Sequence, residues 1–483
     1  MVGRLHNENG LPLTEGAYTS RALIANAQRC VNLYPEKNPA DSEAPVTHNV
    51  TPGLTVLSTA PVLTEGRCLY RASNNVIYAV VGSGVYMISA SWVFTLLGTI
   101  GTTNGICSMV DDDTQILLVD GSPTGYKIIL STNVFSKVTD VNFFGADKVG
   151  FLDTLLVSNV AATQQFQSTK PNVFVWDPLY FASKTGYNDR LVTLAVCHRE
   201  IWLLGSQTSE VWYNAGNAGF PFALFPGTFI QHGCAAKYSV AKHDLNVFWL
   251  SQDDDGQGIV VMGSYYKAER ISTYAIENAI AGYSRIDDAI GFTYQQGGHI
   301  FYVLTFPTAD RTWVYDKQTD LWHERNSIDA NGVEHRWRPN CAVNAYGTVV
   351  ALDYQNGKLY KLDLNSFNED GLPIVRRRGF PHLVSNGNRV SYACFRADIQ
   401  CGEIANYSQT SPAPMIFLRW SDDRGRSWRN PVGQSLGATG EFILQPQWRR
   451  LGMARDRVFE LFWSIDAFTA LNGAWVDPLP MGS

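Results

Sequence analysis

The sequence contains few charged residues and lacks several short patterns on which common functions depend. Asp, Glu, Lys and Arg together make up 17% of its 483 residues, against about a quarter in typical globular proteins. The eight cysteines include no CxxC pair, so we expect buried thiols and neither a cysteine metal site nor a redox motif. No apolar run approaches the roughly 20 residues of a membrane span, and no signal-peptide segment follows Met1. We therefore expect a chain that is soluble when made and folds in a reducing cytoplasm.

The formal net charge of −6 argues against an unassisted electrostatic grip on nucleic acid, because phosphate binding needs clustered Lys and Arg. It leaves open a lumen through which DNA passes without being held. The aromatic content of 12% is high beside the low charge. This combination fits a protein that hides surface in an assembly and equally a β-rich protein, and composition does not separate the two.

A recurring hairpin phrase is the main structural signal. An apolar strand is followed by Gly or Asn and then by a second strand with an aromatic residue. Such a unit cannot bury both faces alone, so its repetition predicts sheets stacked radially, as in a β-propeller. The clearest copies are NNVIYAVVGSGVYMIS at Asn74–Ser89, REIWLLGSQTSEVWYNAG at Arg199–Gly216, GGHIFYVLTFPTADRTWVYD at Gly297–Asp316 and GTVVALDYQNGKLYKLD at Gly347–Asp363.

Turn-forming stretches divide the chain into three regions. Residues 1–60 have little periodicity and several prolines, which predicts an extended arm with one strand available to close a ring. Residues 61–364 contain seven unevenly spaced strand–turn–strand units, which predicts six or seven blades. Helical periodicity is limited to a stretch near Ser272–Ala281. The predicted fold is all-β: a β-propeller followed by a smaller β-rich C-terminal domain at residues 365–483.

The C-terminal region is unusual in its choice of cation. Residues 362–483 contain thirteen Arg and no Lys, whereas the preceding part uses both. Arg offers a planar fork for bidentate pairing and stacks on aromatic rings, so we expect interfaces here; chance clustering is the alternative. Because acids nearly equal the Arg residues, we favour pairing with a neighbouring protein over DNA. The candidate interface residues are Arg376, Arg377, Arg378, Arg449, Arg450, Arg455 and Arg457.

The sharpest local motif is SDDRGRSW, which fits the Asp-box pattern Ser-x-Asp-x-Gly-x-x-Trp with Ser421, Asp423, Gly425 and Trp428. Its chemistry is that of a hairpin turn, in which Asp accepts turn N–H groups, Gly takes a positive φ and Trp packs beneath. The pattern also occurs in sialidase propellers, but we expect a structural role. Glycoside hydrolysis needs two carboxylates at a defined separation, and the clusters at 111–113, 253–255 and 287–288 are better explained as solvated turn acids. No serine nucleophile elbow, phosphate loop or zinc motif is present, so we predict no catalytic, cofactor or metal site.

Several long phrases resemble one known family. NLYPEKNP and TPGL stand near the start. PFALFPGTFIQHGCAAKYSVA, VFWLSQDDDGQGIV and ISTYAIENAI follow in the middle, and LRWSDDRGRSW with QWRRLGMARDRVFEL near the end. Together they resemble the packaged-DNA stabilisation proteins, or tail accessory and hub factors, of short-tailed bacteriophages. The likeness runs from about residue 30 to 465.

The resemblance implies a non-enzymatic structural protein of the virion tail, made in the host cytoplasm. It implies a ring of six copies below the portal protein ring, extending the channel and retaining DNA after packaging. Its other partners would be a tail needle or plug and tailspikes or tail fibres, with DNA passing without sequence-specific binding and no membrane span. The alternatives left open are a propeller glycan-binding protein or glycosidase, suggested by the Asp-box, and a DNA-binding clamp.

Overall fold

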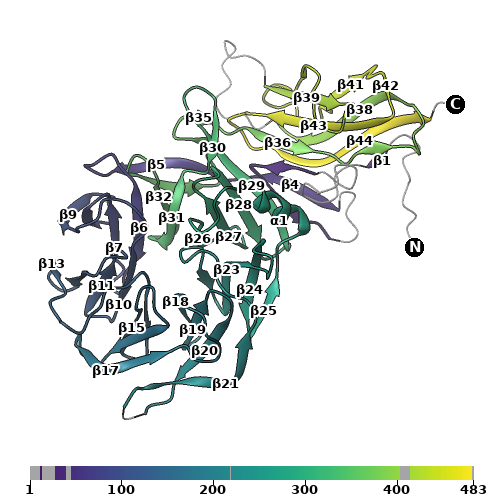
Figure 1. Ribbon diagram of the computed structural model, residues 1–483. Coiled ribbons are helices and arrows are strands. Elements are labelled where there is room, and N and C mark those ends of the chain that lie inside the picture. Colours follow the sequence, from purple (N-terminus) through teal and green to yellow (C-terminus); the bar gives the residue numbers. More distant parts are fainter. Residues whose placement is uncertain (1–10, 13–27, 40–44, 218, 403–413, 481–483) are drawn as a thin grey trace.

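The computed structural model describes residues 11–12, 28–39, 45–217, 219–402 and 414–480, so residues 1–10, 13–27 and 40–44 of the predicted arm at 1–60 lie outside these ranges. Within them, seven four-stranded antiparallel units succeed one another around a centre. Figure 1 shows this propeller with a second body of sheets beside it. The predicted fold class is confirmed, with seven blades and further β-sheets at the C-terminal end.

The first four blades are continuous in sequence and pair in chain order. Blade 1 comprises β6 (Gly66–Arg71), β7 (Ile77–Val81), β8 (Gly84–Ile88) and β9 (Phe94–Thr99). Blade 2 comprises β10 (Ser108–Asp111), β11 (Gln115–Val119), β12 (Gly125–Ile129) and β13 (Val134–Lys137). Blade 3 comprises β14 (Val149–Leu152), β15 (Leu155–Asn159), β16 (Gln165–Thr169) and β17 (Trp176–Ser183). Blade 4 comprises β18 (Leu191–Cys197), β19 (Glu200–Gly205), β20 (Ser209–Asn214) and β21 (Phe222–Ile230).

The last three blades complete the ring. Blade 5 comprises β22 (Ala241–His243), β23 (Asn246–Gln252), β24 (Gly258–Ser264) and β25 (Lys267–Arg270). Blade 6 comprises β26 (Ile290–Gln296), β27 (His299–Phe306), β28 (Arg311–Asp316) and β29 (Leu321–Ile328), with β30 (Glu334–Arg336) paired to β29. Blade 7 takes β31 (Pro339–Ala345), β32 (Thr348–Asp353) and β33 (Lys358–Asp363) from this end of the chain. The first strands of successive blades contact one another all the way round.

A strand from the N-terminal part of the chain closes the propeller. β5 (Gly53–Thr59) pairs antiparallel with β33 and becomes the fourth strand of blade 7. Leu54 on β5 is fully buried in the cluster between blades 6 and 7. The ring is therefore held shut by hydrogen bonds between segments some 300 residues apart in the chain.

Local sequence explains why the blades form. The second strand of each blade lies between two neighbouring strands and under adjacent blades, so it is mostly apolar and buried; β7 is buried at every position. The first two strands join through tight turns whose central residues have positive φ, for example Asp153 and Thr154, or Tyr346 and Gly347. Turns of this kind match the right-handed twist of antiparallel strands. The repeated phrase is thus one half-blade, a hairpin whose faces are covered by its neighbours.

The C-terminal body is a sandwich of two sheets. One sheet has the order β3 (Leu33–Lys37), β4 (Val46–Val50), β44 (Ala470–Pro480), β38 (Val390–Gln400) and β41 (Gln447–Arg449), with β1 (Leu11–Pro12) on β44 and β42 (Met453–Ala454) on β38. The other contains β36 (Arg376–Gly379), β43 (Asp456–Trp463), β39 (Met415–Ser421) and β40 (Val432–Ser435), with β37 (Leu383–Val384) on β43. Both sheets contribute to one apolar core.

One short strand joins the sandwich to the propeller. β2 (Cys30–Val31) pairs in parallel with β29 of blade 6 and antiparallel with β36 of the sandwich, so a single sheet runs from one body into the other. Beside it Arg29 forms an ion pair with Glu324 at 2.8 Å. β34 (Asn368–Glu369), with β35 (Leu372–Pro373), adds a second connection by pairing with β5. The two bodies are therefore linked through backbone hydrogen bonds.

The predicted helical stretch is confirmed as α1 (Tyr274–Ala281), whose first turn is capped by the side chain of Thr273. Within the described ranges, no helix has the length and apolar character that a membrane crossing needs.

Ring closure makes a prediction about stability. Replacing buried Leu54 with Ala should lower the free energy of unfolding by about 2–5 kcal/mol, the usual cost of a cavity in a packed core. Val56 on the same strand is 38% exposed, so Val56→Ala should cost less than about 1 kcal/mol. Urea denaturation followed by tryptophan fluorescence measures both. Equal effects of the two substitutions would contradict a core position for β5.

Candidate functional site

The Asp-box forms the turn between β39 and β40. The Oγ of Ser421 donates to Asp423 Oδ1 at 2.7 Å and accepts the backbone N–H of Gly425 at 2.7 Å. Asp423 also accepts the backbone N–H of Ser427 at 2.8 Å and its hydroxyl at 2.5 Å. Gly425 has a φ of +85°, which side chains rarely tolerate. All of these groups are used to shape the turn.

The electrostatics of the Asp-box agree with this structural role. Hydrogen bonds from Ser427, and then from Ser421, hold the pKa of Asp423 below its usual range. A catalytic acid requires the opposite shift, because it must carry a proton near neutral pH. Trp428 lies under the guanidinium of Arg419, 4.6 Å from its ring centre. The motif therefore contains an ionised carboxylate whose acceptor sites are occupied by its own turn.

The predicted Arg interface is wrong for three of its seven residues. The side chains of Arg376 and Arg378 are fully buried inside the chain, and Arg457 is 2% exposed. Arg376 donates to the carbonyl of Ile465 at 2.8 Å, and Arg378 donates to the backbone and side-chain oxygens of Gln28 at 3.0 and 2.6 Å. Burial lowers the pKa of both guanidinium groups to about 10. They join strands within this molecule and cannot reach another protein.

Arg457 is the centre of a buried cluster in the sandwich. Its Nε and Nη2 donate to the two carboxylate oxygens of Asp422 at 2.6 and 3.0 Å. Its Nη1 donates to the carbonyl of Leu451 at 2.7 Å. The guanidinium also lies 4.7 Å from the ring centre of Tyr392. The Arg chemistry predicted from the sequence, bidentate pairing and aromatic stacking, is present but intramolecular.

The other four Arg residues differ from these. Arg377 is partly buried and pairs with Glu334 at 2.8 Å and with Glu460 at 3.6 Å, across the junction of propeller and sandwich. Arg449, Arg450 and Arg455 are exposed. Among the described residues these three have no carboxylate within ion-pair distance. Arg449, Arg450 and Arg455 therefore remain predicted contact residues for a partner protein.

Ionisable side chains lie just before the first strands of blades 3 and 5. Lys237, before blade 5, forms an ion pair at 2.5 Å with Asp147, before blade 3. Burial, and then the charge of Asp147, raise the pKa of neighbouring Tyr238. Lys148 is partly exposed, yet its surroundings lower its pKa by desolvation. These contacts link the segments that lead into two blades that are not neighbours in the ring.

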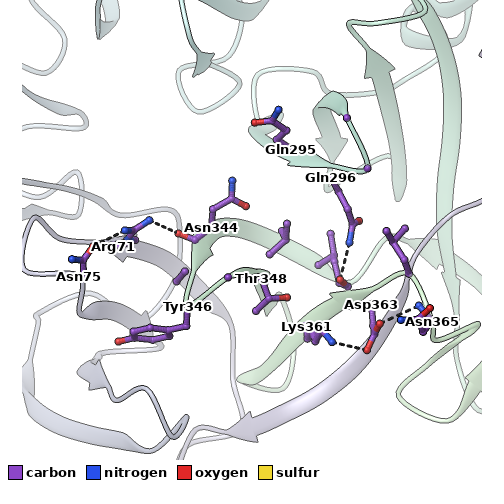
Figure 2. Close-up of a pocket in the computed structure, with 17 residues that line it drawn as sticks. Arg71, Asn75, Gln295, Gln296, Asn344, Tyr346, Thr348, Lys361, Asp363 and Asn365 are labelled. Carbon is purple, nitrogen blue, oxygen red and sulfur yellow. Dashed lines mark hydrogen bonds and ion pairs between the residues drawn. The ribbon is translucent and has the colours of Figure 1, made fainter.

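A shallow pocket of about 840 Å³ lies between the tight turns of blades 6, 7 and 1. Its lining includes the amide side chains of Asn75, Gln295, Gln296, Asn344 and Asn365, which Figure 2 labels. Arg71 donates to the carbonyl of Asn344 at 3.1 Å, and Gln296 donates to that of Leu362 at 2.9 Å, so these contacts tie the blades together. The sequence analysis missed this pocket because its residues come from three turns that only the closed ring brings together.

The chemistry available in this pocket is limited. Asp363 is the one carboxylate among its lining residues, and it pairs with Lys361 at 2.9 Å. Glycoside hydrolysis needs two carboxylates around the bond that breaks. The equivalent turns of blades 3, 4 and 5 form a second depression of about 770 Å³. There Arg199 pairs with Asp153. In each depression a lining carboxylate is thus paired with a neighbouring cation.

The acidic clusters behave as turn residues. Asp112 accepts the backbone N–H groups of Thr114 and Gln115 at 3.0 and 2.8 Å. Asp253 accepts those of Asp255 and Gln257 at 3.2 and 2.8 Å. Within the described residues, no cluster of His, Cys, Asp and Glu has the geometry to hold a metal ion. The carboxylates that the sequence offered for catalysis are used to cap turns.

Buried and exposed Arg residues should differ in how much they contribute to folding stability. Arg457→Ala removes a buried guanidinium that donates to the carbonyl of buried Leu451 and to Asp422, so it should lower the free energy of unfolding by about 1–3 kcal/mol. Arg455→Ala, two residues away and exposed, should change it by less than about 0.5 kcal/mol. Chemical denaturation of both variants provides the measurement. A loss for Arg457→Ala no larger than that for Arg455→Ala would show that the buried guanidinium is dispensable.

The pH dependence of folding stability tests the structural role of the Asp-box. Because the folded pKa of Asp423 is lowered, the stability it provides is present above the usual carboxyl pKa of about 3.9 and is lost as pH falls through the lower folded value. Asp423→Asn should therefore lower the melting temperature at pH 7, and its difference from the unsubstituted chain should shrink below about pH 4. Asp254→Asn, at a turn position without a side-chain hydrogen bond in the described structure, is the control. A pH-independent difference for Asp423→Asn would overturn this assignment.

Comparison with known proteins places the chain. Solved structures with a similar arrangement include the N-terminal domain of Nup159 (11% identity, 69% of this chain and 98% of that one, TM-score 0.41). They also include the WD40 β-propeller domain of Doa1 (11% identity, 65% and 98%, TM-score 0.42). A third is the extracellular domain of the one-component system BT4673 from B. thetaiotaomicron (8% identity, 65% and 40%, TM-score 0.45). No curated protein matches the chain.

A phage stabilisation family described as bacteriophage P22 Gp10, β-propeller, matches residues 9–367, and the chain therefore belongs to this family of structural phage proteins.

Proposed function

We propose that this protein forms a ring of copies, six in number, below the portal ring in the tail of a short-tailed phage. The ring extends the channel, retains packaged DNA, and attaches the tail needle and the tailspikes or fibres. The observation that carries this proposal is the family match over residues 9–367, which makes the chain a Gp10-like stabilisation protein and a structural tail component. The named partners and the six-fold ring go beyond that match.

In this proposal the channel for DNA lies between copies. Lys237 and Asp147, which precede the first strands of blades 5 and 3, form an ion pair at 2.5 Å, so these two segments are tied together within one propeller. A ring of copies offers DNA a separate path, in a lumen bounded by several copies around a symmetry axis.

The charge distribution fits a channel wall that does not bind tightly to the DNA passing along it. Residues 1–361 carry seven net negative charges, and residues 362–483 carry one net positive charge. A surface that binds DNA strongly releases many counterions through clustered Lys and Arg. Three of the seven clustered Arg side chains are buried and unavailable for phosphate. This argues against a DNA clamp and supports a wall along which DNA slides.

The alternative function, a glycan-binding protein or glycosidase, no longer has the support of the motif that suggested it. The Asp-box that suggested it uses Asp423 to bind its own turn, and the main pocket has a single carboxylate among its lining residues. We therefore keep the structural tail protein as the one proposed function.

Phage particles assembled without the protein test this proposal. Heads made by a phage with this gene deleted should package DNA and then lose it, because nothing extends and closes the portal channel. Addition of the purified chain to freshly filled heads should restore DNA retention, measured as nuclease-resistant genome copies per head. Full retention in particles that lack the protein, or its absence from purified virions, would contradict the proposal.

A further inference from the structure

Polar side chains that the chain does not use for its own folding gather in the pocket between the tight turns of blades 6, 7 and 1. Five of its seventeen lining residues are Asn or Gln. Figure 2 shows the unused groups around the pocket, on segments that are separate in the chain. Their side chains form no hydrogen bond with any residue that the structure describes: Gln295, Asn344, Tyr346, Thr348 and Asn365. Because hydroxyl and amide groups both donate and accept, the pocket offers several free hydrogen-bonding groups at once.

The charged groups of the pocket are already bonded within the chain. Lys361 forms an ion pair with Asp363 at 2.9 Å. The guanidinium of Arg71 donates to Asn75 Oδ1 at 2.5 and 3.2 Å and to the carbonyl of Asn344 at 3.1 Å. A ligand that relied on its charge would have to replace these contacts. A neutral ligand with many donors and acceptors matches the groups that remain.

One aromatic residue stands at the pocket wall in a conformation that its backbone disfavours. Tyr346 has a φ of +50°, a region that Gly and Asn adopt readily and in which bulky residues are outliers. The corresponding turn of blade 6 uses Gly297 and Gly298. Tyr346 is 42% exposed, and its ring packs edge-to-face on that of Trp92 in blade 1 with the centres 5.5 Å apart. The turn therefore keeps a strained residue and holds its ring in place, and such strain clusters at ligand-binding sites.

An oligosaccharide combines the two kinds of contact that this pocket offers. Its hydroxyl groups donate and accept, as the free amides do, and the C–H faces of its rings pack on aromatic side chains. Leu364, 44% exposed, and Tyr346 are the large apolar residues exposed at the wall. An extended peptide instead pairs with a row of backbone groups along a sheet edge, whereas these side chains come from separate turns. The arrangement favours a sugar over a peptide.

We propose that this pocket binds a neutral oligosaccharide, with Tyr346 packed on one sugar ring and with Gln295 and Asn365 bonded to hydroxyl groups. Binding is not followed by cleavage, because Asp363 is the one carboxylate in the lining and glycoside hydrolysis needs two. The site adds a contact with a polysaccharide to the proposed role in the tail. It does not depend on the proposed ring, since every residue of the pocket belongs to one chain.

A printed array of neutral oligosaccharides, with uncharged peptides and acidic oligosaccharides beside them, tests the proposal. The purified chain should bind at least one neutral oligosaccharide, which is then titrated in solution by calorimetry. Tyr346→Asn should weaken this binding about 10-fold, because the aromatic contact is lost. Its melting temperature should stay close to that of the unsubstituted chain, because Asn relieves the strain at positive φ and so offsets the lost contact with Trp92.

Tyr265→Asn is the matched control. Tyr265 also has a positive φ, +47°, and is 77% exposed, but it lies on the turn between β24 and β25 and outside the pocket. This variant should bind the sugar like the unsubstituted chain. Gln295→Ala, on an exposed position of the blade 6 turn, should weaken binding about threefold or more through the lost hydrogen bond.

Three results would overturn the proposal. The first is no binding to any neutral oligosaccharide on the array. The second is binding confined to the peptides or to the acidic oligosaccharides. The third is equal affinity of Tyr346→Asn and Tyr265→Asn for the bound sugar. A Tyr346→Asn chain should still restore DNA retention to heads that lack the protein, so failure of this site leaves the proposed function standing.

Discussion

The architecture depends on a short N-terminal segment that is hydrogen-bonded into three different places. Residues 30–59 contribute β2 to the junction, β3 and β4 to the sandwich, and β5 to blade 7. Each pairing joins residues that are hundreds of positions apart in the chain. A propeller without such a strand has an open edge in its last blade, and edges are where sheets fail or aggregate. One segment thus closes the ring and fixes the second body to it.

The buried polar groups follow from this arrangement. Where β2, β29 and β36 meet, residues such as Val31, Arg325 and Arg378 are buried, so the polar groups among them must find hydrogen-bond partners. Arg residues fill this need: Arg325 donates to the carbonyl of Pro52 at 3.1 Å and lies 3.9 Å from the ring centre of Trp337. Arg378 does the same for Gln28. Arg enrichment at this end of the chain therefore reflects an internal junction as much as an external one.

Much of the fold could be predicted because its signals are local. The hairpin phrases carry strand alternation and turn residues within about 15 positions, and the capped stretch at Tyr274–Ala281 is equally local. Whether the side chains of Arg376, Arg377 and Arg378 are buried or exposed could not be predicted in this way. Alternation places Arg376 and Arg378 on one face of β36 and Arg377 on the other, but only the long-range pairing with β2 and β43 decides which face is covered.

For the same reason the sequence could not indicate the pocket between blades 6, 7 and 1, which gathers residues from separate turns. The Asp-box was predictable, since all four of its residues lie within eight positions and its turn satisfies its own hydrogen bonds. Local motifs report local structure here, whereas a pocket shared by three blades arises only when the propeller closes.

Native-state hydrogen exchange tests the central claim most directly, namely that the N-terminal segment holds the two bodies together. If β2 and β5 are integral, their backbone amides should exchange only with the global opening that releases β33 and β36, and with the same free energy. Mass spectrometry of peptides covering residues 30–31 and 53–59 measures this. Rapid exchange of those amides while β33 and β36 stay protected would contradict the account.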